Sequence, residues 1–517
     1  MKTIFVKGFT LVVALFLVLL LSCDKGFEEI NTDPNAPDLS KAAPNLMLTN
    51  AVEGLTDAVY NIWVGHEIGD CWAQHMAKAQ YTDEDRYIPR PDVTNARWTT
   101  YYSRAAMDLV SIKSIARKTM NDNYLGVALV LASYQMSIVT DIWGDAPFTE
   151  AWKAAPADGG ILSPKYDTQE SIYRSLIDSL DLANTMLDPA GSAIGGDILY
   201  NNDILAWKKF ANSLKFRLLL RMSARDEAFV TAELTAMLAA PATYPMFEGV
   251  SDAAALQYLG SAPNNNPLHE NRKTRDDHRV SKTLTDLLYW QTAYVDWRVT
   301  VYAQLSGNGE FEGIPNGLTS VKAAEYNGNG LKYTSKMGTY FLAATSPGYL
   351  MTFAELQFDL AEAAFKGYIP GGDAAAETYY KAGIWSSYEQ YSPVLEEMVD
   401  EYFGLTAGWN WDSLANDFYV NDVWAWDAAR GMECIATQKW VALFGQGLES
   451  WFEYRRLDYP QLVAAEDGVI DIVPVRLPYP TDEQARNSAN RQAAMTNQGL
   501  DGIQNNEMQV RVWWDVN

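Results

Sequence analysis

Residues 171–187 read SIYRSLIDSLDLANTML, and this stretch shows most clearly how the chain folds. Its apolar side chains recur every three or four residues, at Ile172, Leu176, Leu180, Ala183 and Leu187. Because an α-helix completes a turn in about 3.6 residues, this spacing places all five side chains on one face. The stretch therefore predicts an amphipathic helix that packs against a neighbouring element.

Other stretches have the composition of helices, and several are separated from the next by only a short turn. They are Leu125–Thr140, Ile204–Met222, Met351–Phe365, Ala374–Ser386 and Ile435–Tyr454. Alternating helices and short turns are typical of stacked helix pairs such as tetratricopeptide repeats, although the chain shows no clean period of about 34 residues. We expect a mainly α fold of tetratricopeptide-like helix pairs with little β structure.

Long stretches rich in Gly, Asn and Pro separate the predicted helices. They are residues 81–97, 141–167, 189–203, 241–280, 305–349, 389–433 and 457–517. Loops of this length in a folded protein are usually functional. The sequence thus predicts a helical scaffold that carries long irregular loops.

The amino end has the features of a lipoprotein signal. Lys2 and Lys7 precede the apolar run Phe9–Leu21, which is shorter than the roughly 20 residues that cross a bilayer. Ser22 and Cys23 follow the run directly, so we expect cleavage before Cys23 and lipidation of its thiol. The alternative is an ordinary secretory signal with an incidental cysteine.

These features predict three segments. Residues 1–22 are the signal peptide, and residues 23–45, rich in Pro, Asn and Asp, are a lipidated tether. Residues 46–517 form a single α-helical domain with a loop-rich ligand-binding face. No other apolar run approaches 18 residues, so we expect the protein to be anchored to the membrane by its lipid and not to span it.

The composition restricts the partners. The chain of 517 residues has 65 acidic and 40 basic side chains, a formal charge of −25. Nucleic-acid binding needs a basic surface, so we expect no nucleic-acid partner. The aromatic content is high, with 17 Trp, 29 Tyr and 18 Phe, and this excess needs an explanation.

The sequence contains no clear catalytic motif or metal site. His269 and His278 lie in a charged segment whose spacing matches no zinc pattern, so we expect a hydrogen-bonded loop and no metal or cofactor. Glu355, Asp359 and Glu362 share one helix face, where three like charges repel. We expect them to make salt bridges to the loops or to face open solvent, rather than to form a glycosidase's catalytic pair.

The two remaining cysteines, Cys71 and Cys434, are expected to be buried thiols. They are far apart in sequence, so a disulfide between them stays open as an alternative.

Four tryptophans concentrate in one Gly- and Asn-rich stretch, at Trp409, Trp411, Trp424 and Trp426. An aromatic face stacks on the apolar face of a pyranose ring and loses little side-chain entropy on binding. We therefore expect a sugar contact from at least one of the four. The alternative is that they anchor a long loop to its own domain.

A second, weaker candidate surface lies earlier in the chain. It consists of Trp72, Tyr81, Arg86 and Tyr87. Trp98, Tyr101 and Tyr102 follow at helical spacing, and we expect them to lie in the core.

Several sequence blocks, in this order, resemble the SusD/RagB family of nutrient-binding outer-membrane lipoproteins of Bacteroidetes, in its SusD-like branch. The blocks are Phe27–Asn35, Asp141–Ala151, Trp207–Arg217, Asn266–Leu268, Met351–Glu355 with Ala361–Ala364, Gln438–Phe444, Gly447–Arg456 and Pro474–Pro480. Two features depart from the family pattern. Residues 401–430 look like a long insertion, and Asp296-Trp297-Arg298 stands where the family usually has Asp-Pro-Arg.

The resemblance implies four tetratricopeptide-like helix pairs, anchorage at the outer membrane facing outside, and no enzymatic activity or cofactor. It also implies a partner, a SusC-like TonB-dependent transporter, to which captured oligosaccharides or, in some members, peptides are delivered. We expect a glycan-binding lipoprotein, because the excess of Trp favours sugar. Peptide or other nutrient binding by the same architecture is the second possibility, and a surface glycosidase the third.

Overall fold

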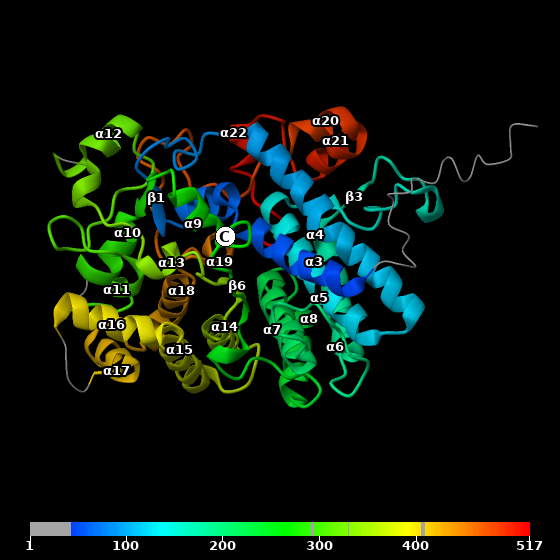
Figure 1. Ribbon diagram of the computed structural model, residues 1–517, viewed down its shortest axis with the longest axis horizontal. Coiled ribbons are helices and arrows are strands. Elements are labelled where there is room, and N and C mark those ends of the chain that lie inside the picture. The colour runs from blue at the N-terminus through cyan, green and yellow to red at the C-terminus, as the bar shows by residue number, and fades with distance from the viewer. Residues whose placement is uncertain (1–42, 291–293, 329, 405–408, 517) are drawn as a thin grey trace, which may run out of the picture. The chain divides into compact units, whose positions relative to one another are not determined.

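The computed structural model describes residues 43–516 except 291–293, 329 and 405–408, and residues Pro44–Asn517 form one compact unit (Figure 1). The predicted signal peptide, Cys23 and nearly all of the tether lie outside the described residues. Helix α3 (Pro44–Val59) begins inside the segment that we assigned to the tether.

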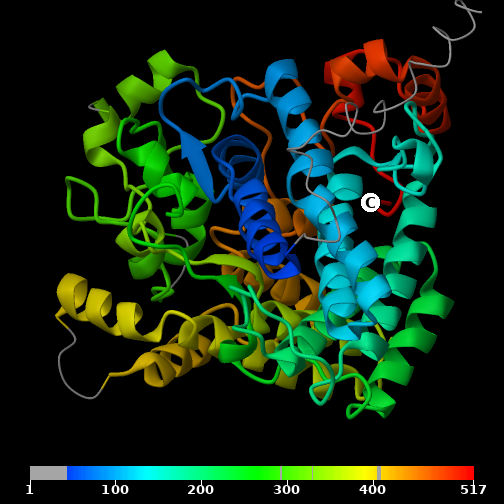
Figure 2. The ribbon, with the colours of Figure 1, turned by 45° about the vertical axis from the view of Figure 1, so that its right-hand side comes forward.

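Ten of the twelve helices of eleven residues or more in the described part of the chain make up most of the scaffold, packed mainly against their neighbours in sequence. They are α3, α4 (Pro91–Thr119), α5 (Asp122–Trp143), α6 (Gln169–Met186), α7 (Ile204–Met222), α8 (Glu227–Ala239), α14 (Phe353–Phe365), α15 (Gly372–Glu389), α18 (Gly431–Ala442) and α19 (Gly447–Leu457). Figure 2 shows α3 to α8 side by side, and α14, α15, α18 and α19 continue the array. The predicted mainly α fold is confirmed.

Helix α6 shows why these sequences fold as they do. Its five stripe residues are all at most 1% exposed, packed between α5 and α7. Thr168 begins the helix by accepting a hydrogen bond from the backbone N–H of Ser171. The apolar stripe thus faces the core as predicted.

The predicted helix Ile435–Tyr454 is wrong in part, because the helix is interrupted between Ala442 and Gly447 and forms two helices, α18 and α19. Gly445 has a φ of 79°, a conformation that favours glycine. Gly447 packs so closely on the π-helix η1 (Ile62–Asp70) that a Cβ there would overlap backbone atoms of Gly65 and Asp70. The glycines thus mark a tight corner that the apolar pattern alone did not show.

The predicted loop 389–433 is also wrong in part, since it contains helices α16 (Ser392–Phe403) and α17 (Trp411–Asn421). Gly404 ends α16 in the left-handed region, and Asn410 forms a capping box with Ser413 at the start of α17. The Gly and Asn residues that suggested a loop are the helix caps.

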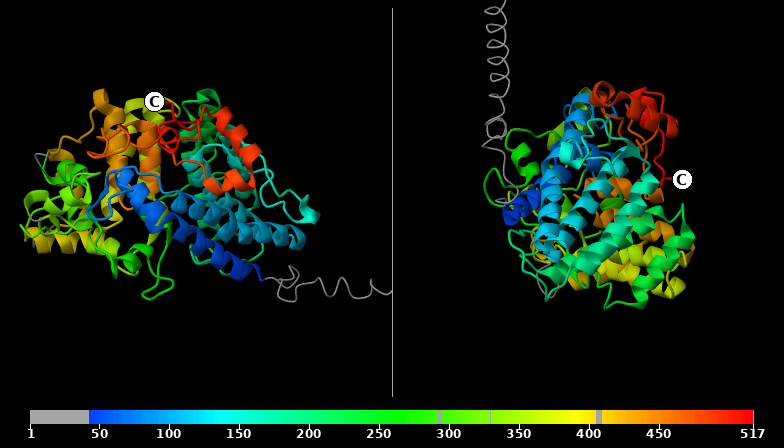
Figure 3. Two further views of the ribbon diagram at one scale, coloured as in Figure 1. Left: turned by 90° about the horizontal axis from the view of Figure 1, so that it is seen from above. Right: turned by 90° about the vertical axis from the view of Figure 1, so that its right-hand side faces the viewer.

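Short helices and strands lie in the other predicted loops and in the segments next to them. The short helices are α9 (Pro267–Arg272), α10 (Lys282–Thr285), the π-helix η4 (Asp286–Trp290), α11 (Val299–Tyr302), α12 (Ser320–Glu325), α13 (Thr339–Leu342), α20 (Thr481–Arg486), α21 (Ser488–Asn497) and α22 (Gln504–Glu507). The antiparallel strand pairs are β1 (Met76–Lys78) with β5 (His278–Val280), β2 (Ala146–Pro147) with β3 (Tyr166–Asp167), and β4 (Ala254–Leu256) with β6 (Gly348–Met351). Figure 3 shows these loop-borne elements beside the helical array.

The acidic face of α14 is buried rather than exposed. Glu355, Asp359 and Glu362 are at most 1% exposed and pair with cations at 2.5 Å. The cations are Arg217 on α7, Lys439 on α18 and Arg456 on α19. Salt bridges were expected here, but their partners come from scaffold helices and not from the loops.

Helix α5 is the one helix in the described residues that is long and apolar enough to cross a membrane. It has 22 residues, whereas the sequence predicted a shorter helix over Leu125–Thr140. In the structure 94% of its most apolar window is buried inside the protein.

Candidate functional site

Aromatic side chains gather where α16 and α17 meet the loops around η4. Figure 1 shows α16 and α17 at the lower left, next to α11. We name this cluster the aromatic ridge; it consists of Tyr289, Trp290, Trp297, Phe311, Phe403 and Trp409. The rings form a continuous series of contacts. Their centroids are 4.9 Å apart for Tyr289–Trp290, 5.3 Å for Tyr289–Phe311, 6.4 Å for Phe311–Phe403, 5.2 Å for Phe403–Trp297 and 6.5 Å for Trp297–Trp409.

Three rings of the ridge reach the surface, while Phe311 is fully buried beneath them. Trp290 is 48% exposed, Trp409 41% and Phe403 37%. Large exposed apolar rings grouped in this way form a candidate binding surface, whereas single exposed rings need no explanation.

Hydrogen bonds hold the rings in place. The indole N–H of Trp290 donates to the carbonyl of Phe311 at 2.8 Å, and that of Trp297 donates to Asp417 at 3.2 Å. The hydroxyl of Tyr289 donates to Glu310, and burial together with this bond raises the pKa of Tyr289 to about 12. The tyrosine therefore stays neutral at neutral pH.

A buried ion pair next to Trp297 holds the turn that carries this residue in place. Arg298 pairs with Asp296 at 2.5 Å, and both are at most 1% exposed. Arg298 also donates to Gln438 of α18, and Tyr388 of α15 donates to Asp296. The scaffold helices thus set the orientation of the ridge, which reduces the ordering cost of binding.

The four tryptophans predicted from the sequence separate in the structure. Trp409 lies on the ridge, and the half-buried Trp411 begins α17 with its backbone N–H bonded to Glu396. Trp424 is only 8% exposed, and Tyr380 donates to its carbonyl. Trp426 packs on Tyr380 at 5.3 Å, so these last two anchor the segment to α15.

The second predicted surface does not assemble. Trp72 and Tyr87 are 3% and 1% exposed and contact each other in the core, so their faces are not available for a ligand. Tyr81 is 63% exposed, with Arg275 over its ring, and Arg86 donates to the carbonyl of Asp467. No contact recorded among the described rings joins Tyr81 to the ridge.

Sequence reasoning missed Trp290 as a site residue. Trp297 was noted only as a departure from the family pattern, and that departure was the signal that could have pointed to the ridge. Of the three aromatic residues expected in the core, Trp98 and Tyr101 are 6% and 1% exposed as expected, whereas Tyr102 is half-buried.

The remaining sequence candidates are structural. Cys71 and Cys434 are free and buried, which excludes the disulfide. His269 bonds to the carbonyl of Leu342, and His278 lies buried 3.5 Å from Glu67. Within the described residues no three potential ligands stand close enough to hold a metal ion.

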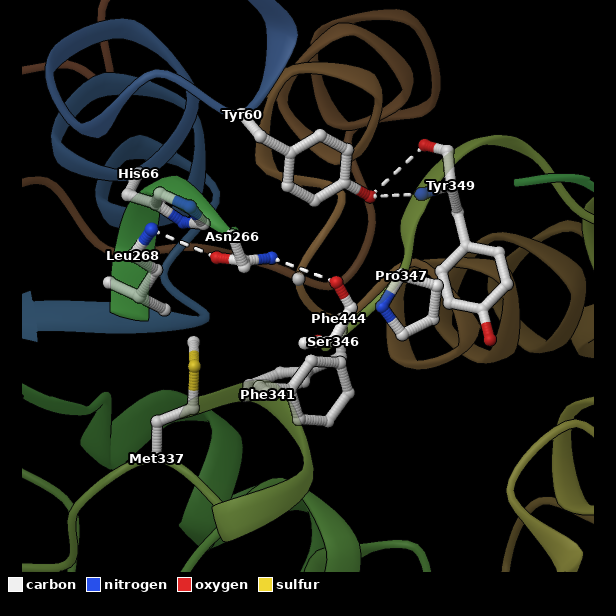
Figure 4. Close-up of a pocket in the computed structure, with 11 residues that line it drawn as sticks. Tyr60, His66, Asn266, Leu268, Met337, Phe341, Ser346, Pro347, Tyr349 and Phe444 are labelled. Carbon is white, nitrogen blue, oxygen red and sulfur yellow. Dashed lines mark hydrogen bonds between the residues drawn. The ribbon is translucent and has the colours of Figure 1, made fainter. Parts of the chain in front are cut away.

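One interior cavity is too small for a sugar. It measures about 10 Å³, roughly the space of one water molecule. Figure 4 shows its lining, in which the hydroxyl of Tyr60 bonds to both backbone groups of Tyr349 and Asn266 bridges Leu268 and Ser346.

A wider cleft of about 480 Å³ lies between the start of α6 and the C-terminal segment. Its charged groups are largely paired internally, since Arg511 binds Asp515 and Arg225 donates to the carbonyl of Trp513. The ridge therefore remains the stronger candidate for ligand binding.

The fold and the ridge together define a helical scaffold protein with an aromatic surface borne by its loops. The chain belongs to the SusD-like family, whose model is described as starch-binding and associating with the outer membrane and matches residues 34–480. This confirms the resemblance drawn from the sequence blocks.

Solved structures have the same fold. A chitin-binding protein is 26% identical with a TM-score of 0.74, covering 92% of this chain and 100% of its own. A chitin-binding SusD homologue from Flavobacterium johnsoniae is 21% identical with a TM-score of 0.71, covering 91% and 99%. A SusD homologue from Bacteroides vulgatus is 22% identical with a TM-score of 0.72, covering 91% and 98%. A search of curated protein sequences finds no match.

Proposed function

We propose that the aromatic ridge binds a neutral oligosaccharide, and that the protein captures the sugar without cleaving it. The observation that carries this proposal is the group of exposed rings of Trp290, Phe403 and Trp409, held from below by Trp297 and Phe311. Such rings can stack on successive sugars, and the neighbouring carboxylates of Glu310 and Asp417 can accept hydrogen bonds from hydroxyls.

Charge supports a neutral ligand. The chain has a formal charge of −25, which disfavours sulfated or uronate polymers. The family description and the names of two structural relatives make glucose and N-acetylglucosamine polymers the first ligands to test.

The burial of the α14 carboxylates supports a role without catalysis. Glu355, Asp359 and Glu362 are inaccessible to a glycosidic bond and are already paired with cations. A glycosidase would need two such groups beside its substrate.

The proposed setting is the cell surface. The lipid on Cys23 would anchor the protein to the outer membrane facing outside, and bound sugar would pass to a SusC-like TonB-dependent transporter. Support comes from the lipoprotein signal in the sequence and from the family's association with the outer membrane.

Calorimetric titration with maltoheptaose and chitohexaose tests the binding site. Replacing Trp409 by Ala should weaken binding of the preferred sugar about tenfold and lower the melting temperature little, because the ring is 41% exposed. Tyr81→Ala is the matched control, since it removes an exposed ring outside the ridge. Trp72→Ala removes a buried ring and should lower the melting temperature strongly.

Three results would contradict the proposal. Intact binding by Trp409→Ala together with a large drop in melting temperature would assign that ring to the scaffold. Release of shorter sugars during the titration would show that the protein is an enzyme, and binding of a cationic peptide in preference to either sugar would favour the peptide alternative.

A further inference from the structure

A second cavity with an aromatic lining lies at the other end of the helical array from the ridge. It measures about 210 Å³ and lies between α4, the segment after β2 and α20. Trp98 and Tyr102 come from α4, Trp152 from the segment after β2, and Glu483 from α20. In Figure 1, α4, β3 and α20 lie to the right, whereas α16 and α17 lie at the lower left.

The three rings form one continuous group. Trp98 and Tyr102 have centroids 4.9 Å apart, and Tyr102 and Trp152 have centroids 5.6 Å apart. Trp152 has a φ of 60°, a backbone conformation that bulky residues rarely adopt. Its position is held by a hydrogen bond from its indole N–H to the carbonyl of Tyr102 at 2.8 Å.

The cavity offers few hydrogen-bond donors to a ligand. The Trp152 indole is engaged as above, and the Tyr102 hydroxyl donates to the carbonyl of Pro147 at 2.8 Å. The lining residues Pro147 and Pro164 have no backbone N–H, and that of Ala151 bonds to Phe148. Two donors remain for a ligand, the indole N–H of Trp98 and the backbone N–H of Trp152, neither of which meets an acceptor in the described part of the chain. A sugar, with many hydroxyls to satisfy, would find too few partners here.

The electrostatic character of the cavity is negative. Glu483 contributes a carboxylate that is held by a hydrogen bond from the Tyr166 hydroxyl to one of its oxygens at 2.7 Å. No Lys, Arg or His is among the described residues that line the cavity. Aromatic faces are themselves electron-rich, so the rings and the carboxylate attract the same kind of group.

We propose that this cavity binds an organic cation, a primary or quaternary ammonium on a short apolar body. The ammonium would lie against the half-buried rings of Tyr102 and Trp152, with the buried Trp98 packed against Tyr102, and Glu483 would supply the balancing charge. The volume suits a group of the size of choline or of a single amine-bearing side chain. This site is separate from the sugar-binding ridge and does not depend on the function proposed for it.

Calorimetric titration of the purified protein with choline tests the proposal. The matched uncharged probe is 3,3-dimethyl-1-butanol, which has the shape of choline with carbon in place of the ammonium nitrogen. Choline should bind at least about tenfold more tightly than this alcohol, because only the charged probe gains the cation–π and carboxylate attraction.

Variants then locate the site. Glu483→Gln should weaken choline binding at least about tenfold, and Trp152→Phe, which keeps an aromatic ring, should weaken it less than Trp152→Ala. Glu227→Gln, which removes an exposed carboxylate on α8, is the charge-matched control and should change nothing. Circular dichroism checks that each variant is folded.

Equal affinity for choline and the alcohol would overturn the proposal, as would unchanged choline binding in a folded Glu483→Gln variant. Tighter binding of glucose than of choline at the Glu483 site would also overturn it. Trp409→Ala should leave choline binding unchanged, and Glu483→Gln should leave oligosaccharide binding unchanged. The proposals for the two sites can therefore be refuted independently of each other.

Discussion

Replacing Lys439 by Met should destabilise the protein strongly, because it leaves a buried carboxylate without its counter-charge. The Lys439 ammonium lies 2.5 Å from both Asp359 and Glu453, and its side chain is 1% exposed. Glu453 keeps Arg221 at 2.9 Å and Arg456 at 2.7 Å. Asp359 loses its hydrogen-bonded cation, and its second oxygen has no hydrogen-bond partner in the described structure.

The expected loss in the free energy of unfolding is about 3–5 kcal/mol at pH 7, the range for removing one partner of a buried ion pair. The matched control is Lys366→Met, which breaks a 3.0 Å pair with Glu362 at a side chain that is 31% exposed. A pair of that kind contributes about 1 kcal/mol or less. Because Met and Lys have similar helix propensities, the change in stability of each variant reports the loss of the charge and not a change in helix propensity.

The pH dependence gives an independent check. Burial raises the pKa of Asp359 to about 6 even beside Lys439, which lowers it, and removal of that cation raises the pKa further. A carboxyl group whose pKa is higher in the folded state takes up protons preferentially there, so acidification favours folding. The gap between wild type and Lys439→Met should therefore narrow by up to about 1 kcal/mol between pH 7 and pH 6.

Urea unfolding followed by circular dichroism at the two pH values measures both effects. A loss below about 1 kcal/mol at pH 7, or a gap that does not narrow at pH 6, would refute the reasoning. The first result would mean that Asp359 relaxes to solvent, and the second that Asp359 stays ionised in the folded variant down to pH 6.

Two further predictions concern Glu362 and the amino end. Burial alone would raise the pKa of Glu362, but the charges of Arg456 and Lys366 outweigh this effect and lower the pKa to about 2. The ionised carboxylate therefore stabilises the fold above pH 4.5, and this contribution is lost as the pH falls toward 2. Glu362→Gln should thus lower the free energy of unfolding by about 3 kcal/mol at pH 7. In acid unfolding curves the difference in stability from the wild type should shrink below pH 4.5. A difference that stays constant with pH would contradict the lowered pKa of Glu362. Cys23→Ser should move the protein from the membrane fraction to the soluble or medium fraction in the native host, and retention in the membrane would exclude lipidation at Cys23 as the anchor.

The helical scaffold was largely predictable, because its signal is local. The stripe of α6 appears in 17 consecutive residues, and every member of it is buried. The corner between α18 and α19 was missed, because it depends on how closely Gly447 meets a helix that lies almost 400 residues earlier in the chain.

The site was predictable only in part, because its rings come from distant segments. Trp409 was found from local composition, but it contacts Trp297 more than 100 residues away. The pairing of Glu355 with Arg217 spans 138 residues, so the sequence showed three like charges without showing the cations that neutralise them. Composition indicates that aromatics are abundant, whereas only tertiary packing separates the exposed Trp409 from the buried Trp424.

The hairpin of α16 and α17 has a consequence for how this protein can change over evolutionary time. Phe403 ends α16 and Trp409 precedes α17, while Tyr419 of α17 and Trp426 beyond it pack on Trp385 and Tyr380 of α15. The residues that would meet a ligand are therefore different from those that hold the hairpin in place. A new ligand preference can therefore arise by exchange of exposed rings such as Phe403 and Trp409, and the contacts that hold α17 on α15 would not have to change.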